Sequence, residues 1–309
     1  MELIRGLHNL RPRHRGCAAT IGNFDGVHLG HQAVLGQLSE RAAELNLPGV
    51  VIIFEPQPQE FFSPATAPPR LTRLREKLEA LRRYAVERVL VLRFDARLAA
   101  LTADQFIQRV LVEGLDVRYL VVGDDFRFGQ GRAGDFRLLQ ETGARAGFQV
   151  VNMHTFAIGG ARVSSTRVRT ALAQGDLEAA EALLGRPYRI SGRVAAGEQR
   201  GRTIGFPTAN IHLHRHQAPL QGVYAVELFG LEQEPLSGVA NLGRRPTVGG
   251  TRLQLEVHLF DFDRQIYGRN VHVNFLRRIR DERTFESFDA LRRQIDADAA
   301  QARAFFAAR

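Results

Sequence analysis

Residues 18–31 read Ala-Ala-Thr-Ile-Gly-Asn-Phe-Asp-Gly-Val-His-Leu-Gly-His, and this stretch decides the fold of the first half of the chain. It begins as a short apolar run, continues as a glycine-bearing loop and leads into residues that recur at helical spacing. The glycines let the backbone approach a phosphate chain closely, and the start of the helix offers free N–H groups. The stretch is therefore typical of a strand, a phosphate-binding loop and a helix in succession.

Four further apolar runs follow at 50–54, 89–92, 119–122 and 149–153, with helical patterns between them. Strands separated by helices predict a doubly wound, Rossmann-like parallel sheet. Ligands on such sheets bind at the carboxyl ends of the strands, which is where the loop of residues 22–28 would lie.

The pattern changes at residues 185–187, Gly-Arg-Pro, which we interpret as the linker between two domains, 1–185 and 186–309. Short β-like runs separated by turn residues then predict a small antiparallel β-barrel or a sandwich. A helix from about residue 285 to 305 is expected to close the chain. The β-like runs are 188–194, 222–229, 236–242, 253–262 and 270–275.

Length and composition favour an ordinary globular protein. The chain has 309 residues and a hydrophobic fraction of 44%, which is enough apolar material for two cores. It has no run of about 18 apolar residues that could span a membrane, and residues 1–5, Met-Glu-Leu-Ile-Arg, lack the basic start and long apolar run expected of a signal peptide. The single cysteine, Cys17, has no partner for an internal disulfide. We therefore expect a cytoplasmic protein without a membrane partner.

The net charge of +9 comes almost entirely from arginine, because Lys77 is the only lysine. A GC-rich genome that encodes arginine in place of lysine explains this, and so does a polyanionic partner. The arginines are scattered rather than gathered in a block, so we expect no nucleic-acid partner. Small phosphorylated ligands suit a basic protein, since arginine makes bidentate contacts with phosphate.

His28 and His31 are the first candidate catalytic residues. They are three positions apart and project from one face of the first helical turn. Two imidazoles there can contact an α-phosphate and stabilise charge that grows in the transition state. The alternatives are a helix cap with two surface histidines and, less well supported, a metal site, for which neither a cysteine nor a third ligand is nearby.

This segment resembles the nucleotidyltransferase signature of prokaryotic bifunctional riboflavin kinase/FAD synthetases. Segments 54–58 (Phe-Glu-Pro-Gln-Pro), 123–129 (Gly-Asp-Asp-Phe-Arg-Phe-Gly) and 163–169 (Val-Ser-Ser-Thr-Arg-Val-Arg) match the same family. The resemblance implies adenylylation of FMN by ATP, with His28 and His31 catalytic. The nucleotide-binding residues that it implies are Gly22, Phe24, Asp25, Gly26, Gly30, Asp125, Arg127, Ser164, Ser165, Thr166 and Arg169, and the flavin-binding residues are Phe54, Pro56 and Gln57.

The 163–169 segment also has a physical interpretation of its own. Serine and threonine start helices, and the free N–H groups of such a helix, together with Arg169, can hold a triphosphate tail. A plain capped helix remains the alternative, as an exposed hairpin tip does for the Asp-Phe-Arg-Phe residues at 125–128. Gln57 departs from the family, which usually has histidine there, and glutamine cannot become a cation. A kinase with an impaired adenylyltransferase half is therefore the second hypothesis.

Residues 197–210, Gly-Glu-Gln-Arg-Gly-Arg-Thr-Ile-Gly-Phe-Pro-Thr-Ala-Asn, resemble the riboflavin kinase signature. A glycine-bearing loop can fold over phosphates, while Thr208 and Asn210 offer uncharged oxygens to Mg²⁺ from one face of a strand. The alternative is a glycine-rich hairpin with buried polar groups. The nucleotide-binding residues implied here are Gly197, Gly201, Arg202, Gly205 and Pro207.

Glu256 alternates with apolar neighbours along its strand, and a carboxylate that points into the mouth of a barrel needs a partner or a task. The resemblance makes it the general base for the riboflavin 5′-hydroxyl, whereas a salt bridge to an arginine is the alternative. His258 lies on the same face and is expected to pack or to form a hydrogen bond. Segments 222–225 and 238–247 match the family too, and we assign Asn241 and Arg245 to flavin binding.

Together these patterns predict an enzyme that phosphorylates riboflavin to FMN and adenylylates FMN to FAD, with riboflavin, FMN, FAD and ATP as its partners and Mg²⁺ as its cofactor. A flavin-binding or nucleic-acid-binding regulator that reuses the fold is the hypothesis from another class, and Thr208, Asn210 and Glu256 disfavour it. The sequence leaves a homo-oligomer open.

Overall fold

The computed structural model describes residues 1–153, 156–195, 207–215, 217–247 and 250–309. The chain divides into two compact units, one of residues 1–68 and 72–164 and the other of residues 69–71 and 165–309. Among the described residues, no helix combines the length and the apolar character needed to cross a bilayer.

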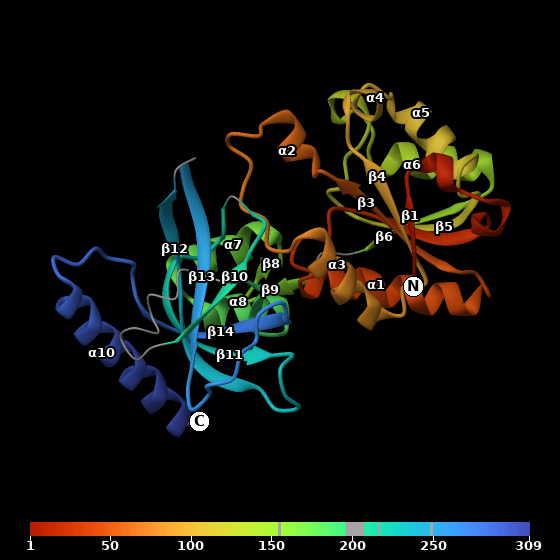
Figure 1. Cartoon of the computed structure of the whole chain (residues 1–309). Helices are drawn as coiled ribbons and strands as arrows, with labels where there is room; N and C mark the ends of the chain where they lie inside the picture. The colour runs from red at the N-terminus through yellow and green to blue at the C-terminus, as the bar shows by residue number, and fades with distance from the viewer. Residues whose placement is uncertain (154–155, 196–206, 216, 248–249) are drawn as a thin grey trace. The chain divides into compact units, whose positions relative to one another are not determined.

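The first unit is built on a six-stranded sheet of order β1-β4-β3-β2-β5-β6, in which every neighbouring pair is parallel (Figure 1). This confirms the predicted doubly wound sheet. The edge strand β1 was missed, because only two apolar residues stand between its charged ends. The strands are β1 (Glu2–Arg5), β2 (Cys17–Ile21), β3 (Gly49–Glu55), β4 (Arg88–Arg93), β5 (Val117–Gly123) and β6 (Gln149–Met153).

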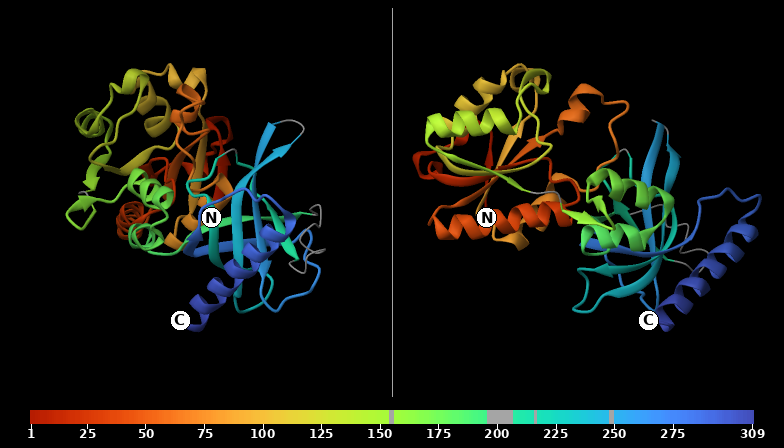
Figure 2. Two further views of the ribbon diagram at one scale, coloured as in Figure 1. Left: turned by 90° about the vertical axis from the view of Figure 1, so that its left-hand side faces the viewer. Right: turned by 180° about the vertical axis from the view of Figure 1, so that it is seen from behind.

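Helices cover both faces of this sheet (Figure 2). The α-helices are α1 (Leu29–Glu44), α2 (Pro58–Phe62), α3 (Leu74–Leu81), α4 (Ala96–Ala99), α5 (Ala103–Phe106) and α6 (Phe136–Ala146), and α5 continues as a π-helical turn, η4 (Ile107–Val112). Short 3₁₀ helices are η1 (Leu7–Asn9), η2 (Pro12–His14), η3 (Arg82–Tyr84) and η5 (Gln130–Arg132), and a small hairpin joins β7 (Ala157–Ile158) to β8 (Ala161–Arg162).

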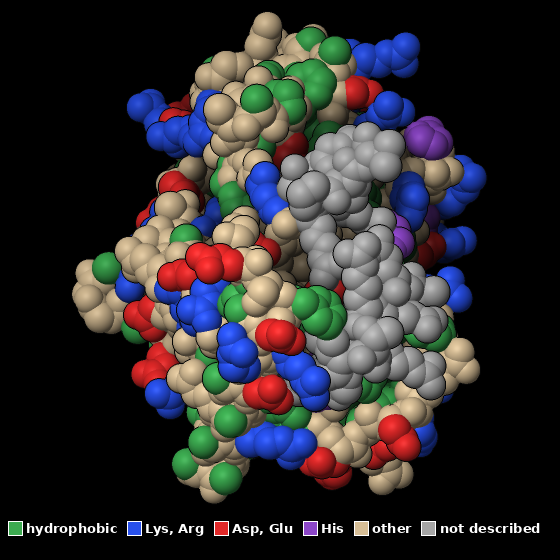
Figure 3. Space-filling model, turned by 60° about the vertical axis from the view of Figure 1, so that its left-hand side comes forward, with side chains coloured by type: hydrophobic (Ala, Val, Ile, Leu, Met, Phe, Trp, Pro, Cys, Tyr) green, Lys and Arg blue, Asp and Glu red, His purple; other side chains and the backbone are tan. Residues whose placement is uncertain are grey.

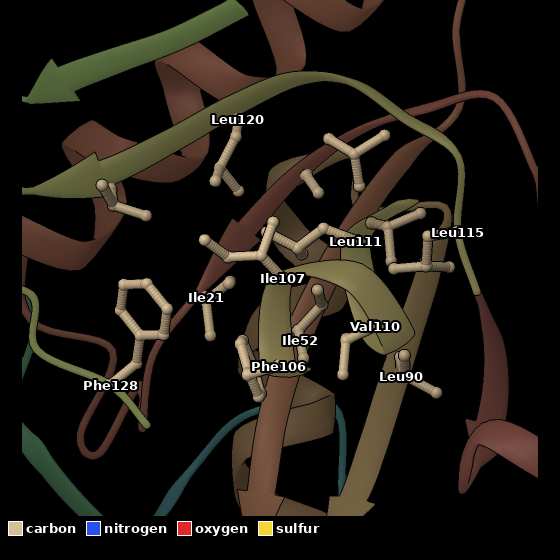
Figure 4. Packing of buried hydrophobic residues seen from close by; sticks show 14 of the residues in the cluster. Ile21, Ile52, Leu90, Phe106, Ile107, Val110, Leu111, Leu115, Leu120 and Phe128 are labelled. Atoms are coloured by element: carbon tan, nitrogen blue, oxygen red, sulfur yellow. The ribbon is translucent and has the colours of Figure 1, made fainter. Parts of the chain in front are cut away.

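Each face of the sheet carries its own apolar core, which explains why the strands read as continuous apolar runs. On one face Ile52 and Leu120 pack against Ile107 and Leu111 of the η4 segment (Figure 4). On the other face, Leu35 and Leu38 of α1 pack in a second apolar cluster together with Val51 and Val121 of the sheet. Packing on both faces fixes the carboxyl ends of the strands, and the loop of residues 22–28 begins at the carboxyl end of β2.

The second unit contains a closed antiparallel barrel of order β10-β13-β12-β11-β14-β9, so the predicted barrel is confirmed and the sandwich is not. Its strands are β9 (Tyr188–Ala195), β10 (Thr208–His212), β11 (Gly222–Phe229), β12 (Leu236–Thr247), β13 (Gly250–Leu259) and β14 (Asn270–Arg280). The helices of this unit are α7 (Ser165–Gln174), α8 (Leu177–Leu184) and α10 (Phe288–Ala307).

The C-terminal helix α10 covers part of the outer face of the barrel. Ala299 and Ala302 of the helix pack against Val239 and Phe260, and a partly buried ion pair with an N–O distance of 2.7 Å joins Arg280 to Asp298. Helix α8 contacts β9 and β14, so the two helices that precede residue 185 belong to the same compact unit as the barrel.

Candidate active sites

The loop that follows β2 is held by buried hydrogen bonds to Thr72. A carboxylate oxygen of Asp25 accepts from the backbone N–H of Thr72 at 2.9 Å and from its hydroxyl at 3.1 Å. The same hydroxyl accepts from the N–H of Gly26 at 3.0 Å. Asp25 and Thr72 are 2% and 7% exposed. The buried carboxylate of Asp25 therefore stabilises the loop itself.

His28 is the N-cap of α1, and its Nδ1 accepts from the backbone N–H of His31 at 3.3 Å. This leaves the proton of the neutral ring on Nε2. The two imidazoles stack, with ring centroids 3.6 Å apart and planes at 16°. His28 is buried rather than a surface residue, and the predicted helix cap and the predicted imidazole pair are therefore the same feature.

Positive charge surrounds His31. Burial, followed by the charges of His28, Lys77 and Arg162, holds the pKa of the His31 imidazole well below its usual 6.5. Its Nδ1 is buried and has no hydrogen-bond partner among the described residues. His31 is thus a neutral imidazole in a cationic setting, which suits an approaching anion.

Aromatic and glycine residues shape the same surface. Phe24 is buried, and its ring centroid lies 4.9 Å from that of His31. A Cβ atom on Gly30 would lie 3.3 Å from the ring of His28 and 3.4 Å from the carbonyl oxygen of Val163. Any larger residue at 30 would press on the histidine, so the glycine has a packing reason as well as a place in the loop. Gly22 begins this loop, where a Cβ would meet the Phe24 ring at 3.2 Å.

The 54–58 segment lies at the carboxyl end of β3, and ligands of doubly wound parallel sheets bind at this end of the strands. Phe54 and Gln57 are buried, and the peptide bond between Glu55 and Pro56 is cis. The Nε2 of Gln57 is buried without a partner in the described chain. The segment also starts an aromatic cluster of Phe54, Phe94, Phe61 and Phe62, in which Phe94 contacts each of the other three at centroid distances of 5.6–5.7 Å.

Asp125 and Arg127 occupy the exposed turn after β5. Arg162 of β8 donates to Asp125 at 2.6 Å and lies 3.3 Å from Asp124. Arg127 lies 4.0 Å from Asp135. Arg162 was not singled out from the sequence, although its charge acts on His31.

The 163–169 segment is split between the units. Ser164 ends the first unit, whereas Ser165, Thr166 and Arg169 lie on α7 in the second. The predicted helix start at the Ser-Thr pair is confirmed. Within the second unit, the Nε of Arg169 donates to the carbonyl of Pro69 at 2.7 Å.

The barrel brings the predicted kinase residues into one row. Asn210 of β10 lies opposite Glu256 of β13, and Glu256 lies opposite Asn241 of β12 on its other side. Thr208 shares the face of Asn210, two positions earlier on the strand. All four side chains are half-buried. Strands that run far apart in the sequence thus meet at a single polar patch.

This patch faces outward, and the expectation that Glu256 points into the mouth of the barrel was wrong. Leu255 and Val257 are fully buried, so the alternation along β13 directs Glu256 to the opposite, outer face. Gln254 lies on that face and was missed. Its side-chain amide donates to the Oδ1 of Asn210 and, at 3.3 Å, to a carboxylate oxygen of Glu256.

His258 behaves as predicted, as a hydrogen-bonding residue. Its Nδ1 lies 3.0 Å from the carbonyl oxygen of Pro207, and burial lowers the pKa of its imidazole. Gly197, Gly201, Arg202 and Gly205 lie outside the described residues, and the side chain of Arg245 is not among those described. In the described part of the chain, no three His, Cys, Asp or Glu side chains gather as metal ligands.

Two family profiles divide the chain between them, that of FAD synthetase over residues 10–167 and that of riboflavin kinase over residues 184–306. A bifunctional riboflavin kinase/FMN adenylyltransferase of Escherichia coli (strain K12) is 56% identical over 307 residues, which cover 99% of this chain and 98% of the relative. The chain belongs to the bifunctional riboflavin kinase/FMN adenylyltransferase family.

Other relatives agree along the whole length. The riboflavin kinase/FMN adenylyltransferase of Haemophilus influenzae is 53% identical and covers 99% of each chain. A crystal structure described as a macrolide-efflux protein from Streptococcus pneumoniae superposes with a TM-score of 0.80 at 31% identity, over 96% of this chain and 97% of that one. As a member of the riboflavin kinase/FMN adenylyltransferase family, the chain uses ATP to phosphorylate riboflavin to FMN and to adenylylate FMN to FAD.

Proposed function

We propose that the two activities have separate sites, FMN adenylylation at the loop and helix start of residues 22–31 and riboflavin phosphorylation at the polar patch on the barrel. The corresponding domains are residues 1–185 and 186–309. The observation that carries this division is the stacked pair of His28 and His31, which is built entirely within the first unit, whereas Glu256 and Asn210 are paired entirely within the second.

In the adenylylation step, a phosphate oxygen of FMN attacks the α-phosphorus of ATP, and the bond to the leaving pyrophosphate breaks. Charge grows on the α-phosphoryl oxygens, and N–H groups of His28 and His31 stabilise it. The tautomer fixed by the His28 cap presents Nε2–H as a donor. The buried Nδ1 of His31, which lacks a partner in the described chain, supports a role for that ring in ligand binding.

In the kinase step, Glu256 takes the proton of the riboflavin 5′-hydroxyl as the oxygen attacks the γ-phosphorus of ATP and ADP leaves. Thr208 and Asn210 offer uncharged oxygens beside this carboxylate, a hard donor set that fits Mg²⁺. When bound, the ion neutralises charge on the phosphates. Gln254 holds Asn210 and Glu256 at one spacing before ligands arrive.

FMN, the substrate of the first domain, binds beside residues 54–57. Asn241 and Arg245 bind riboflavin, the substrate of the second domain. Support comes from the aromatic cluster next to Phe54, in which Phe61 and Phe62 are 37% and 64% exposed. Exposed rings of this kind offer stacking surfaces to a planar tricyclic ligand. The buried free thiol of Cys17 accords with a cytoplasmic enzyme.

A mixing experiment tests the division of labour. His28→Ala should convert riboflavin to FMN but form FAD only very slowly, whereas Glu256→Gln should convert supplied FMN to FAD but phosphorylate riboflavin only very slowly. An equimolar mixture of the two full-length variants, given riboflavin, ATP and Mg²⁺, should form FAD, which chromatography detects. If either variant alone makes FAD from riboflavin at the wild-type rate, the corresponding site is misassigned.

A further inference from the structure

Lys77 is completely buried in α3, with 0% of its surface exposed, and its Nζ donates to the carbonyl oxygen of Asn23. It is also the only lysine in the chain, since all the other basic residues among the 42 are arginine. A buried ammonium is costly unless hydrogen bonds and opposite dipoles compensate it. Neither the proposed kinase step nor the proposed adenylylation step assigns a role to this residue.

The identity of the residue fits its surroundings. An ammonium is a compact point charge on a flexible stem, whereas the guanidinium of arginine is a wide planar fork. At this fully enclosed position a compact cation suits the carbonyl oxygen of Asn23. In a chain that uses arginine almost everywhere, the one lysine thus lies at a fully enclosed position.

The loop that Lys77 holds is under backbone strain. Phe24 and Val27 have φ values of 48° and 44°, a region that is unfavourable for a bulky residue and more so for a β-branched one. Such residues persist only where the surroundings over-determine them. Here hydrogen bonds from two residues fix the loop. Thr72, just before α3, bonds Asp25 and Gly26, and Lys77 of α3 bonds the carbonyl oxygen of Asn23.

The strained loop runs directly into His28 and His31, and the charge of Lys77 is felt there. Together with burial and with the charges of His28 and Arg162, it lowers the pKa of the His31 imidazole. A fixed cation that repels a proton from an imidazole attracts a phosphoryl oxygen to the same place by the same Coulomb term.

We propose that Lys77 is a positioning residue for FMN adenylylation, one that fixes the carbonyl of Asn23, and with it the approach to His28 and His31, and that adds a buried positive charge to the phosphate-binding side of this pair. The proposal rests on the assignment of adenylylation to the two histidines. Its test therefore includes His28→Ala as a separate arm.

The first measurement compares Lys77→Met, which keeps a long unbranched side chain without the charge, with Arg75→Met on the exposed side of the same helix. Lys77→Met should lower kcat for FAD formation from FMN by about 10²-fold, the scale of a small misplacement of reacting groups. Riboflavin phosphorylation should stay within about twofold, and Arg75→Met should leave both activities within about twofold. Unchanged FAD formation in Lys77→Met, or equal loss of both activities in folded protein, overturns the proposal.

The His28→Ala arm separates the two ideas. If His28→Ala lowers FAD formation by about 10²–10³-fold and Lys77→Met leaves it unchanged, the histidine assignment stands and the proposal for Lys77 fails. If His28→Ala leaves FAD formation intact, the histidine assignment itself fails.

A second measurement needs no variant that could misfold. Because Lys77 is the only lysine, full-length protein labelled with ε-¹³C-lysine should give one lysine NMR signal. We expect an ammonium chemical shift at neutral pH and a displacement of the signal when inorganic pyrophosphate, a product of adenylylation alone, is added. A neutral-amine shift, or no response to saturating pyrophosphate, contradicts the proposal. A separate readout does use the variant. In folded Lys77→Met the pKa of the His31 imidazole should rise, whereas removal of a lysine that only filled space would leave this pKa unchanged.

Discussion

The imidazole of His31 lies flat against that of His28, with ring centroids 3.6 Å apart, and the backbone N–H of His31 donates to Nδ1 of the same ring. Two side chains three positions apart are thereby locked by a cap and by a stack at once. Turning the His28 ring would break both contacts, and turning the His31 ring would break the stack. A pair that is held in this way is preorganised, and preorganised donors stabilise a transition state without reorganisation during the reaction.

Replacing either histidine by alanine should therefore cut FAD formation from FMN by about 10²–10³-fold, the usual scale for loss of one such donor. Riboflavin phosphorylation in the same protein should be largely spared. Steady-state rates of both reactions check this. Equal loss of both activities would point to misfolding and would remove the support for the assignment.

The lowered pKa of His31 predicts a pH dependence of stability. The unfolded chain takes up a proton near the ordinary pKa of 6.5, while the folded protein does so only at lower pH. Between these two values the unfolded state binds more protons, so stability is full above about pH 6.5 and falls as the pH drops toward the folded pKa. His31→Gln should lose less of its melting temperature than wild type between about pH 7.5 and pH 5.5. An equal loss in both proteins would show that His31 titrates normally.

Sequence patterns predicted five of the six sheet strands and the loop with its histidines, because apolar runs and glycine placement are local signals. They did not predict that Thr72 and Lys77 hold this loop from 46 to 54 positions away in the chain. Long-range hydrogen bonds leave no periodic trace in a sequence. The only available sign was the isolation of Lys77 among arginines.

Gln57 stands where the family usually has histidine, and its side chain is buried at the N-cap of α2. We expect Gln57→His to change the rate of FAD formation little, because His28 and His31 already supply the main donors and glutamine can also hydrogen-bond. The rate with saturating FMN and ATP is the measurement. A gain of tenfold or more, about 1.4 kcal/mol, would show that a cation at position 57 contributes to catalysis.

The barrel unit should retain kinase activity in isolation. Fragment 165–309 keeps α7 and α8 with the barrel, whereas fragment 184–309 loses the buried side chains of Leu177 and Leu183. Both fragments lack residues 69–71, so they are matched in that respect. We expect both to phosphorylate riboflavin, and the shorter one to melt at least about 5 °C lower, since a buried leucine contributes roughly 1.5–3 kcal/mol. A folded but inactive fragment 165–309 would place part of the kinase site elsewhere.

The barrel shows another limit of sequence reasoning. Alternation along residues 253–260 correctly separated Glu256 from its apolar neighbours, but it could not say which face was interior. The outer face is apolar too where α10 covers Val239 and Phe260, so composition alone does not distinguish the two sides. On the face drawn in Figure 3, acidic and basic side chains are interspersed outside the grey residues, in keeping with scattered arginines rather than a basic block.

The proposed role of Glu256 as general base can be tested against variants of its neighbours Thr208 and Asn210. A primary hydroxyl is a poor nucleophile, and proton removal in the transition state typically contributes about 10²–10⁴-fold. Glu256→Gln preserves the shape of the side chain and its hydrogen bond with Gln254 while it removes the base. It should therefore lower kcat for FMN formation sharply and leave ATP binding nearly intact.

Thr208→Ala and Asn210→Ala should act differently, by raising the Mg²⁺ concentration needed for half-maximal rate, because each removes an oxygen from the proposed metal site. FAD formation from supplied FMN should survive in all three variants. The deciding measurement is kcat for riboflavin phosphorylation by Glu256→Gln at saturating ATP and Mg²⁺. A value within about threefold of wild type, far below the usual contribution of a general base, would mean that Glu256 only orders Gln254 and Asn210 and that another group takes the proton.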